Sequence, residues 1–212
     1  MENFVITIAR GYGSGGRSIG KMLAKELNIP YYDRELLRLA SDESGINEEL
    51  FGKADETIRQ SLLYKIAKKE YKGELIPPDR EEFVSNDNLF TYQAKVIRDL
   101  AEAGPCVVIG RCADYVLKDM PNVVRLYIHA PIEKCVERER GILIGNDKEV
   151  EHQIRSIDKR RAAYYKYYTQ QEWNSADHYD LCLNTADFDY QTCVEIVKSY
   201  LQIRLAKSQK TE

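Results

Sequence analysis

The chain has 212 residues and a formal net charge of −3, a length that suits one α/β domain and a charge that argues against a nucleic-acid-binding role. Apolar residues make up 43% of the sequence, enough for a sizeable core, but no apolar run approaches the about 20 residues that a membrane span needs. The five cysteines form no Cys-x-x-Cys pair, and the chain leads straight into a strand-like run rather than a signal peptide. We therefore expect a cytoplasmic protein with reduced thiols that binds neither nucleic acid nor membrane.

The first expected element is an apolar strand over Phe4–Ala9, and a glycine-rich turn follows it before a helix over Ser18–Leu27. This order is the context of a phosphate-binding loop, because glycines let backbone N–H groups turn inward and the helix start adds positive potential. The loop formula ends in Gly-Lys-Ser/Thr, whereas this chain has Gly16-Arg17-Ser18. Four glycines in six residues exceed what a tight turn needs. We expect Ser18 to contact Mg²⁺, and a phosphate group to lie on Gly11, Gly13, Ser14, Gly15, Gly16, Arg17 and Ser18.

A short strand over Ile29–Tyr32 ends in Asp33 and Arg34. Ligands of open α/β sheets sit beyond the carboxyl ends of the strands, so both side chains are placed to meet one. Asp33 is equally suited to cap a helix over residues 34–40, and the two roles are compatible. The following residues are mostly polar and helical, which predicts an inserted helical region over about 40–90.

A helix over 91–103 precedes an apolar strand, Cys106–Ile109, that ends in Gly110-Arg111. An arginine directly after a buried strand points its guanidinium at the same crevice as the glycine loop, and its fork suits phosphate oxygens. Arg111 is therefore a candidate anion ligand. We expect Asp114, by contrast, on a helix surface.

The strand Val123–His129 leads into a helix that carries Arg138, and a glycine-bounded loop over 141–149 follows. Two arginine-bearing helices joined by such a loop favour a lid, over about 139–155, that brings cations onto a phosphate. An ordinary salt-bridged helix surface is the alternative.

The long helix predicted over about 150–168 carries Arg155, Asp158 and Arg161 at i, i+3 and i+6, on one face. Four tyrosines between positions 164 and 168 must include at least two core or interface residues. If some of them are interface residues, two copies of the chain could form a homodimer through this helix.

A last strand over Asp180–Leu183 and an amphipathic helix over Gln191–Leu205 complete the pattern, and residues 207–212 form a frayed tail. Strands and helices alternate along the chain. We therefore predict the α/β class, with a parallel sheet flanked by helices in a single domain over 1–206.

Together these motifs resemble the cytidylate kinase-like branch of the P-loop nucleoside monophosphate kinases. The resemblance covers most of the chain except the 40–90 insert. It rests on Ile6-Thr7-Ile8 with the glycine loop, Tyr32-Asp33, Val108-Ile109-Gly110-Arg111, Val124–Ala130, Asp158-x-x-Arg161 and Tyr179–Thr185. It implies a P-loop NTPase-type sheet with a helical insert and a lid, and transfer of the ATP γ-phosphoryl group, with Mg²⁺, to an acceptor.

The resemblance also implies roles for individual residues. The loop from Gly13 to Ser18 would cradle the donor phosphates, and Arg111 would hold the acceptor phosphate. The resemblance implies catalytic roles for Arg138, Asp158 and Arg161, with both arginines stabilising charge in the transfer, and we expect Arg17 to share this work from the loop. The expected acceptor-binding residues are Asp33, Arg34, Arg111 and Asp158.

The sequence departs from the family pattern in the loop and after Asp33. An ungapped comparison from Ile6 to Leu27 places Gly16, not Arg17, where the family's loop has its lysine. The family's serine and arginine after the Asp33 position are not matched in register, and no carboxylate follows Cys106–Ile109. Two functions stay open: a kinase for a nucleoside monophosphate, cytidylate-like, or another small acceptor, and a non-catalytic nucleotide or phosphate sensor on the same fold.

Overall fold

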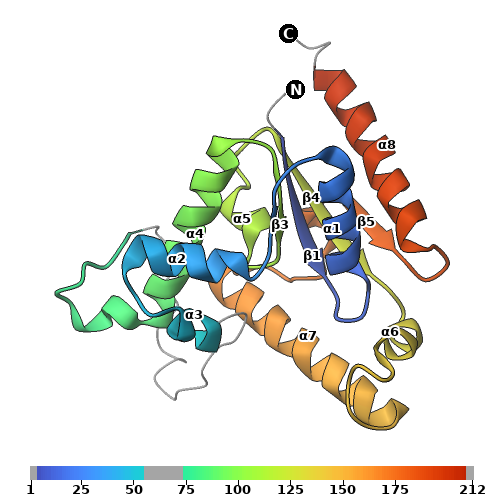
Figure 1. Cartoon of the computed structure of the whole chain (residues 1–212), viewed down its shortest axis with the longest axis horizontal. Helices are drawn as coiled ribbons and strands as arrows, with labels where there is room; N and C mark the ends of the chain where they lie inside the picture. The colour runs from blue at the N-terminus through green and yellow to red at the C-terminus, as the bar shows by residue number, and fades with distance from the viewer. Residues whose placement is uncertain (1–3, 55–73, 209–212) are drawn as a thin grey trace.

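The computed structural model describes residues 4–54 and 74–208, which contain a five-stranded sheet in the order β2-β3-β1-β4-β5. Every neighbouring pair of strands is parallel, so all carboxyl ends meet at one edge of the sheet. This edge also carries the glycine-rich turn, which lies at the bottom of Figure 1 beside α6 and the start of α7. The strands are β1 (Val5–Arg10), β2 (Tyr31–Tyr32), β3 (Cys106–Ile109), β4 (Val123–His129) and β5 (Leu181–Asn184). The predicted parallel α/β sheet is confirmed.

Helices cover both faces of the sheet (Figure 1). α1 and α8 pack against one face, and α4, α5 and α7 lie on the other. α2 and α3 extend beyond the β2 edge. The helices are α1 (Gly16–Leu27), α2 (Glu35–Ser44), α3 (Glu48–Ala54), α4 (Asn86–Ala103), α5 (Ala113–Val116), α6 (Ile132–Glu139), α7 (Asp147–Thr169) and α8 (Tyr190–Ser208), with 3-10 turns at Glu81–Val84 and Ala176–His178.

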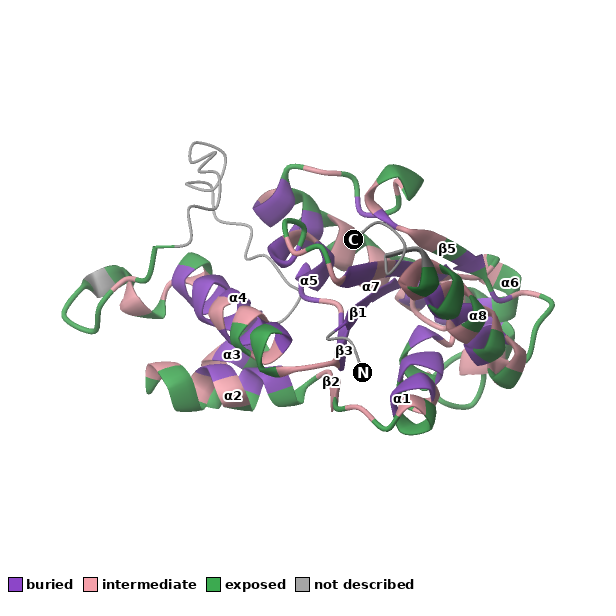
Figure 2. Cartoon of the chain, turned by 90° about the horizontal axis from the view of Figure 1, so that it is seen from above, coloured by how far each residue is buried: buried purple, intermediate pink, exposed green. Residues whose placement is uncertain are grey.

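β1 is buried along its whole length (Figure 2), and it separates the two larger of the three core clusters; the third lies between α6 and α7. Successive side chains of a strand point to opposite faces, so Ile6 and Ile8 pack with α1 and α8, whereas Val5 packs with α4 and α7. The near-continuous apolar run of this strand is what a central parallel strand requires.

Two helices begin earlier than predicted because capping residues extend them. The side chain of Ser85 accepts a hydrogen bond from the backbone N–H of Asn88, so α4 begins at Asn86 rather than at 91. Asn146 and Glu149 form a reciprocal capping box, so α7 begins at Asp147 inside the predicted loop.

The predicted insert and tail are only partly described. α2 and α3 supply helical structure between residues 35 and 54, as expected, while residues 55–73 lie outside the described residues. α8 continues to Ser208, so residues 207 and 208 are helical rather than frayed, and residues 209–212 lie outside the described part.

No helix in the two described ranges is both long and apolar enough to cross a membrane. All five cysteines are free; four are buried and Cys182 is exposed.

Candidate active site

The turn between β1 and α1 presents backbone N–H groups at the start of a helix. Gly15 is the N-cap of α1 in a left-handed conformation (φ 83°), and Ser14 closes the turn by donating from Oγ to the carbonyl of Gly11 at 2.8 Å. Such a helix start leaves donors that an anion can satisfy. Within residues 4–54 and 74–208, no hydrogen bond is made by the backbone N–H groups of Gly13, Gly15, Arg17 and Ser18.

The loop glycines leave no room for side chains, because neighbours pack directly on their Cα atoms. A Cβ on Gly15 would lie 2.3 Å from Cε1 of Tyr190, and one on Gly16 would lie 2.6 Å from Cβ of Arg10. The shape of the loop is therefore fixed by packing against β1 and α8 as well as by its own turn.

Asp158 of α7 is joined to the loop. Both of its carboxylate oxygens accept the backbone N–H of Tyr12, at 2.9 and 3.1 Å. Burial raises the pKa of Asp158, and the Tyr12 N–H with the charges of Arg161 and Arg10 opposes that rise. NH1 of Arg161 lies 3.3 Å from Asp158 Oδ1 and donates to the carbonyl of Arg10 at 3.4 Å. The structure therefore brings Asp158 and Arg161 together at the glycine loop.

Arg17 and Arg111 converge on Asp33 at the end of β2. Nε of Arg17 lies 2.6 Å from Asp33 Oδ2, and NH1 of Arg111 lies 3.5 Å from Asp33 Oδ1. NH1 of Arg111 also donates to the carbonyl of Asp33 at 2.7 Å. Because Arg17 begins in the loop and Arg111 follows β3, Asp33 links the glycine loop to the neighbouring strand ends.

The prediction that Asp33 caps a helix is wrong. Arg34 is the N-cap residue of α2, and no side chain accepts a capping hydrogen bond there. The Asp33 carboxylate faces the two arginines instead, because these cations offer it stronger partners than a helix end. The Arg34 side chain is exposed, so the structure does not bring it into the cluster around Asp33.

Arg138 joins α6 to the glycine loop and to the segment after β5. Its guanidinium donates to the carbonyl of Thr185 at 2.6 Å, to Thr185 Oγ1 at 2.8 Å and to the carbonyl of Ser14 at 3.2 Å. It also lies over the ring of Tyr190, 5.5 Å from the centroid. Thr185 ends the Tyr179–Thr185 segment that carries the family resemblance, whereas Tyr190 was not selected from the sequence, because its contact with Arg138 joins residues far apart in the chain.

Asp114 is buried, so its predicted place on a helix surface is wrong. α5 spans only Ala113–Val116, and the preceding Arg111 and Cys112 both adopt positive φ, which turns the helix inward. The carboxyl accepts the hydroxyl of Tyr165 at 2.6 Å. Desolvation by burial raises the pKa of Asp114, and the hydrogen bond from Tyr165 opposes this rise.

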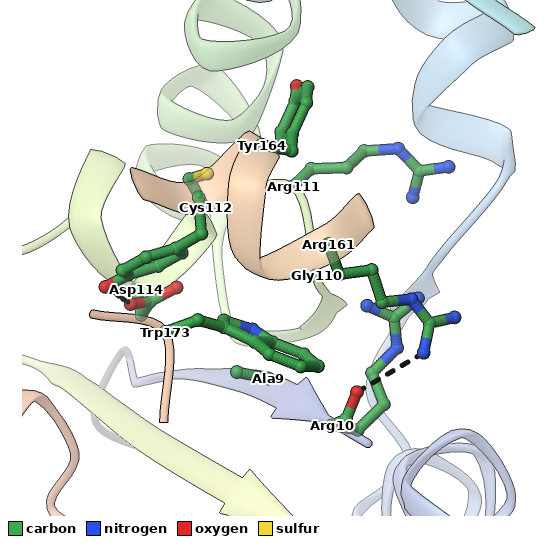
Figure 3. Close-up of a pocket in the computed structure, with 10 residues that line it drawn as sticks. Ala9, Arg10, Gly110, Arg111, Cys112, Asp114, Arg161, Tyr164 and Trp173 are labelled. Carbon is green, nitrogen blue, oxygen red and sulfur yellow. Dashed lines mark hydrogen bonds between the residues drawn. The ribbon is translucent and has the colours of Figure 1, made fainter. Parts of the chain in front are cut away.

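A small cavity lies between the ends of β1 and β3 and helix α7 (Figure 3). Arg10, Arg111 and Arg161 line it together with Asp114 and Trp173. Arg10 is buried and was missed from sequence, although it ends a buried strand directly before a loop, much as Arg111 follows β3 after one glycine. The signal that selected Arg111 would have selected it as well.

The remaining predicted residues lie around this centre. Arg155 is exposed and pairs with Glu151 at 2.7 Å, and it lines a surface pocket together with Asp158 and Gly11. Ser18 is exposed on the first turn of α1. The tyrosine prediction is confirmed, since three of the four are core residues: Tyr164, Tyr165 and Tyr168.

The loop fits a nucleotide phosphate chain with Mg²⁺. Its N–H donors stand at a helix start, where the backbone can meet an anion directly. No group of three or more metal-ligating His, Cys, Asp or Glu side chains occurs in the described part of the chain. Mg²⁺ in such sites is held by one or two side chains and by the phosphates, so Ser18 is compatible with it.

A parallel 2-3-1-4-5 sheet with a glycine loop after its first strand defines the P-loop kinase fold. The model of the cytidylate kinase-like family matches residues 5–187, and the chain belongs to that family.

The solved structures similar to this chain include kinases and an uncharacterised protein. The last, from Eubacterium ventriosum ATCC 27560, is 24% identical with a TM-score of 0.70, over 95% of this chain and 99% of that one. A shikimate kinase from Bacteroides thetaiotaomicron is 14% identical with a TM-score of 0.55, over 95% and 99%. A gluconokinase from Sinorhizobium meliloti 1021 is 14% identical with a TM-score of 0.53, over 98% and 96%. These likenesses concern the fold, and no curated protein matches the chain.

Proposed function

We propose that this chain transfers the γ-phosphoryl group of ATP to a small acceptor, with a nucleoside monophosphate of the cytidylate type as the first candidate. One observation carries the proposal: α7 places Asp158 and Arg161 directly on a glycine loop whose backbone donors stand at a helix start. A phosphate-binding loop alone would serve a sensor equally well, whereas phosphoryl transfer also needs charged groups positioned at the transferred group.

In the proposed reaction an acceptor oxygen bonds to the γ-phosphorus while the bond to the β,γ-bridging oxygen breaks, and ADP leaves. Bound ATP with Mg²⁺ supplies the phosphoryl group and neutralises part of its charge. The loop N–H groups hold the donor phosphates, and Ser18 contributes a hydroxyl to the metal. Asp158 accepts the proton of the acceptor group. Charge growing on the transferred group is stabilised by Arg17, Arg138 and Arg161.

The acceptor lies, in this proposal, between the ends of β2 and β3. Asp33 and Arg111 meet there, and Asp158 borders the same space from α7. Arg34 would reach this site only by moving from its exposed position.

The loop between α6 and α7 is proposed as the lid, over about 139–155. Gly141 and Gly145, both at positive φ, bound a loop whose Ile142 and Ile144 are exposed. Closure of this loop would exclude water from the phosphates, next to Arg138 of α6.

A phosphate or nucleotide sensor is the second candidate, favoured by the position of Arg17. Its guanidinium lies on Asp33 rather than over the loop, and it replaces the lysine of the loop formula. An arginine fork is a poor substitute for a compact ammonium group, so the loop would bind a nucleotide without promoting transfer.

The two candidates are separated by a coupled ADP-release screen over nucleoside monophosphates and small hydroxylated acids, with AMP-PNP binding measured by calorimetry. The kinase proposal predicts turnover with at least one acceptor. Arg17→Ala should abolish this turnover, whereas Arg160→Met should keep it, because Arg160 is an exposed arginine of α7. AMP-PNP binding without turnover on any acceptor would favour the sensor instead.

We also propose that the protein is cytoplasmic, binds neither nucleic acid nor membrane, and forms a homodimer through α7. Light scattering would test the dimer, with a monomer mass contradicting it. A retarded DNA or RNA band at physiological salt would contradict the statement on nucleic acid, and sedimentation with lipid vesicles would contradict the statement on membranes.

A further inference from the structure

Arg17 begins on the glycine loop, but its side chain lies across to the end of β2. Its Nε is 2.6 Å from Oδ2 of Asp33, although 53% of the Arg17 side chain is exposed. Burial raises the pKa of Tyr12 in the loop and that of Tyr31 in β2, and the positive charge of Arg17 opposes the rise at both residues. Arg17 thus stands between the loop proposed for the donor and the space proposed for the acceptor.

The backbone of Arg17 is held in place, whereas its side chain is able to rotate. The carbonyl of Arg17 accepts the hydroxyl of Tyr31 at 3.4 Å. One turn further along α1, a Cβ on Gly20 would lie 2.8 Å from Cδ1 of Ile109 and 3.0 Å from Cδ1 of Ile8, so the helix start lies tightly against the sheet. A half-exposed side chain changes rotamer quickly. The charge of Arg17 can therefore move by rotation of the side chain alone.

Asp33 stays at the end of β2 whichever way Arg17 turns. NH1 of Arg111 donates to the carbonyl of Asp33 at 2.7 Å and lies 3.5 Å from Asp33 Oδ1. Only 12% of the Asp33 side chain is exposed, and its Oδ1 accepts no hydrogen bond from the part of the chain that the structure describes. Arg17 is the closer of the two cations, so a largely buried carboxylate depends on it.

One guanidinium cannot lie on Asp33 and on a phosphate in the loop at the same time. The backbone N–H of Arg17 is one of the loop donors with no hydrogen bond in residues 4–54 and 74–208, so an anion bound there lies beside the root of the same side chain. A nucleotide phosphate chain carries more negative charge than one carboxylate and attracts the guanidinium more strongly. The two placements of Arg17 are therefore alternatives, and a ligand that favours one depopulates the other.

We propose that the Arg17–Asp33 ion pair is an autoinhibitory latch: it holds the cation away from the donor phosphates until a nucleotide enters the loop, and the nucleotide then releases the Asp33 carboxylate into the acceptor space. This inference rests on the proposed function, because it needs a nucleotide on the glycine loop, and it adds the regulation of that site. The latch lowers the affinity for nucleotide by the fraction of molecules in which Arg17 is paired. Asp33 becomes available to an acceptor once the donor is bound.

The test is a double-mutant cycle on AMP-PNP binding. Calorimetry with Mg²⁺ measures the affinity of wild type, Asp33→Asn, Arg17→Met and the double variant. Asp33→Asn removes the latch, so we expect it to bind AMP-PNP about 3- to 10-fold more tightly than wild type. Arg17→Met removes both the latch and the phosphate contact. In that background, Asp33→Asn should change the affinity by less than about twofold, because no latch is left to remove.

Asp42→Asn is the matched control, because Asp42 pairs with Arg38 at 2.8 Å on the exposed face of α2. Its affinity for AMP-PNP should stay within about twofold of wild type. Unchanged or weaker binding by Asp33→Asn overturns the latch and makes the pair a structural link between α1 and β2. An equal gain with and without Arg17, or an equal gain in Asp42→Asn, also overturns it, since the lost negative charge alone would then explain the effect.

A measurement on the unmutated chain covers the case in which Asp33→Asn does not fold. The NMR signal of the Arg17 Nε–H group, assigned by its loss in Arg17→Met, should shift when AMP-PNP is added, because Nε leaves Asp33. A signal that stays unchanged at saturating AMP-PNP contradicts the proposal.

The same cycle separates a failure of the latch from a failure of the proposed function. If AMP-PNP binds to wild type but Asp33→Asn shows no gain, the latch alone fails. If AMP-PNP binds to none of the four proteins, the proposed function fails, and inorganic tripolyphosphate then takes its place in the cycle, because the latch needs only a phosphate chain on the loop. A gain in tripolyphosphate affinity that depends on Arg17 supports the latch, and no binding or no gain overturns it.

Discussion

Tyr12 of the glycine loop donates its backbone N–H to both carboxylate oxygens of Asp158, at 2.9 and 3.1 Å. This contact fastens α7, which follows the proposed lid, to the loop proposed to hold the donor phosphates. The same carboxylate is largely buried, and burial is the main cause of its raised pKa. Burial thus disfavours the charged form of Asp158 while the contacts from Tyr12 and Arg161 favour it, and such a perturbed environment is typical of functional sites.

Asp158→Asn should therefore lower activity without lowering stability at neutral pH. A pKa above its ordinary value of 3.8 means that the native state binds more protons than the unfolded state, so the contribution of Asp158 to the unfolding free energy falls as pH rises through that range. Asparagine does not ionise, so the variant does not lose stability in this way as pH rises. The difference between the melting temperatures of the variant and of wild type should therefore become more positive with increasing pH. Turnover should drop by about 10²-fold or more.

Glu133→Gln serves as the control, because Glu133 is an exposed carboxylate on α6. Its melting temperature should follow that of wild type at every pH. A large loss of stability in Asp158→Asn at neutral pH would contradict the prediction and make the Tyr12 contact structural.

Gly15→Ala should destabilise the protein. The new Cβ would lie 2.3 Å from Cε1 and 2.7 Å from Cζ of Tyr190, and the residue has φ +83°, which an L side chain rarely adopts. We expect the unfolding free energy to fall by about 1–3 kcal/mol and AMP-PNP binding to weaken, measured by denaturation and calorimetry.

Gly52→Ala is the matched control on α3. A Cβ there meets nothing within 4 Å, and a helix-interior glycine costs about 0.5–1 kcal/mol relative to alanine. This substitution should stabilise the protein or leave it unchanged. Equal destabilisation by both substitutions would argue against a packed loop.

The glycine loop and the parallel sheet could be predicted because their signals are local. An apolar run, clustered glycines and an amphipathic helix follow each other within Phe4–Leu27, and each follows from the chemistry of neighbouring residues. Arg111 could be predicted for the same reason, since its place after an apolar strand fixes its position at the sheet edge.

The contacts that shape the site could not be predicted, because they join distant segments. Whether Asp33 caps a helix or pairs with arginines depends on Arg17 and Arg111 arriving from other elements. The burial of Asp114 depends on Tyr165, which is 51 residues away. A sequence pattern does not show which distant residues meet in the fold. It therefore cannot distinguish an exposed or capping aspartate from one that is buried or paired.

Arg138→Met should loosen the junction between the loop, α6 and the segment after β5. The guanidinium donates to Thr185 O at 2.6 Å, Thr185 Oγ1 at 2.8 Å and Ser14 O at 3.2 Å, so its loss removes three hydrogen bonds, of which only the one to Ser14 O has a substitute, from the Thr185 hydroxyl at 2.8 Å. We expect the unfolding free energy to fall by about 2–3 kcal/mol. Arg138→Lys should not restore it, because an ammonium cannot span these acceptors.

Arg140→Met provides the comparison, since Arg140 is exposed and pairs only with the exposed Asp147 among the described residues. It should change the unfolding free energy by less than about 1 kcal/mol. Equal losses in the Arg138 and Arg140 variants would show that Arg138 is an ordinary surface charge.

Asp180→Asn should destabilise the opposite end of the sheet in a pH-dependent way. Asp180 accepts the backbone N–H of Arg125 at 2.8 Å and pairs with the guanidinium groups of Arg125 and Arg204, at 3.1 and 3.0 Å. Burial alone would raise the pKa of Asp180, but the hydrogen bonds from Arg125 and Arg204 outweigh it and the pKa is lowered. The carboxylate thus fastens α8 to β4.

A native pKa below the ordinary 3.8 means that the unfolded state binds more protons, so this stabilisation is complete above about pH 4 and is lost as pH falls through the lowered native value. At neutral pH, Asp180→Asn should lower the unfolding free energy by about 1–3 kcal/mol, and the gap to wild type should close on acidification. Urea denaturation at several pH values measures the unfolding free energy of each protein and the difference between them. Asp187→Asn, an exposed aspartate after β5, should leave the curve unchanged. A gap that stays constant from pH 7 to below pH 3 would mean that packing of the side chain, and not its charge, joins α8 to the sheet.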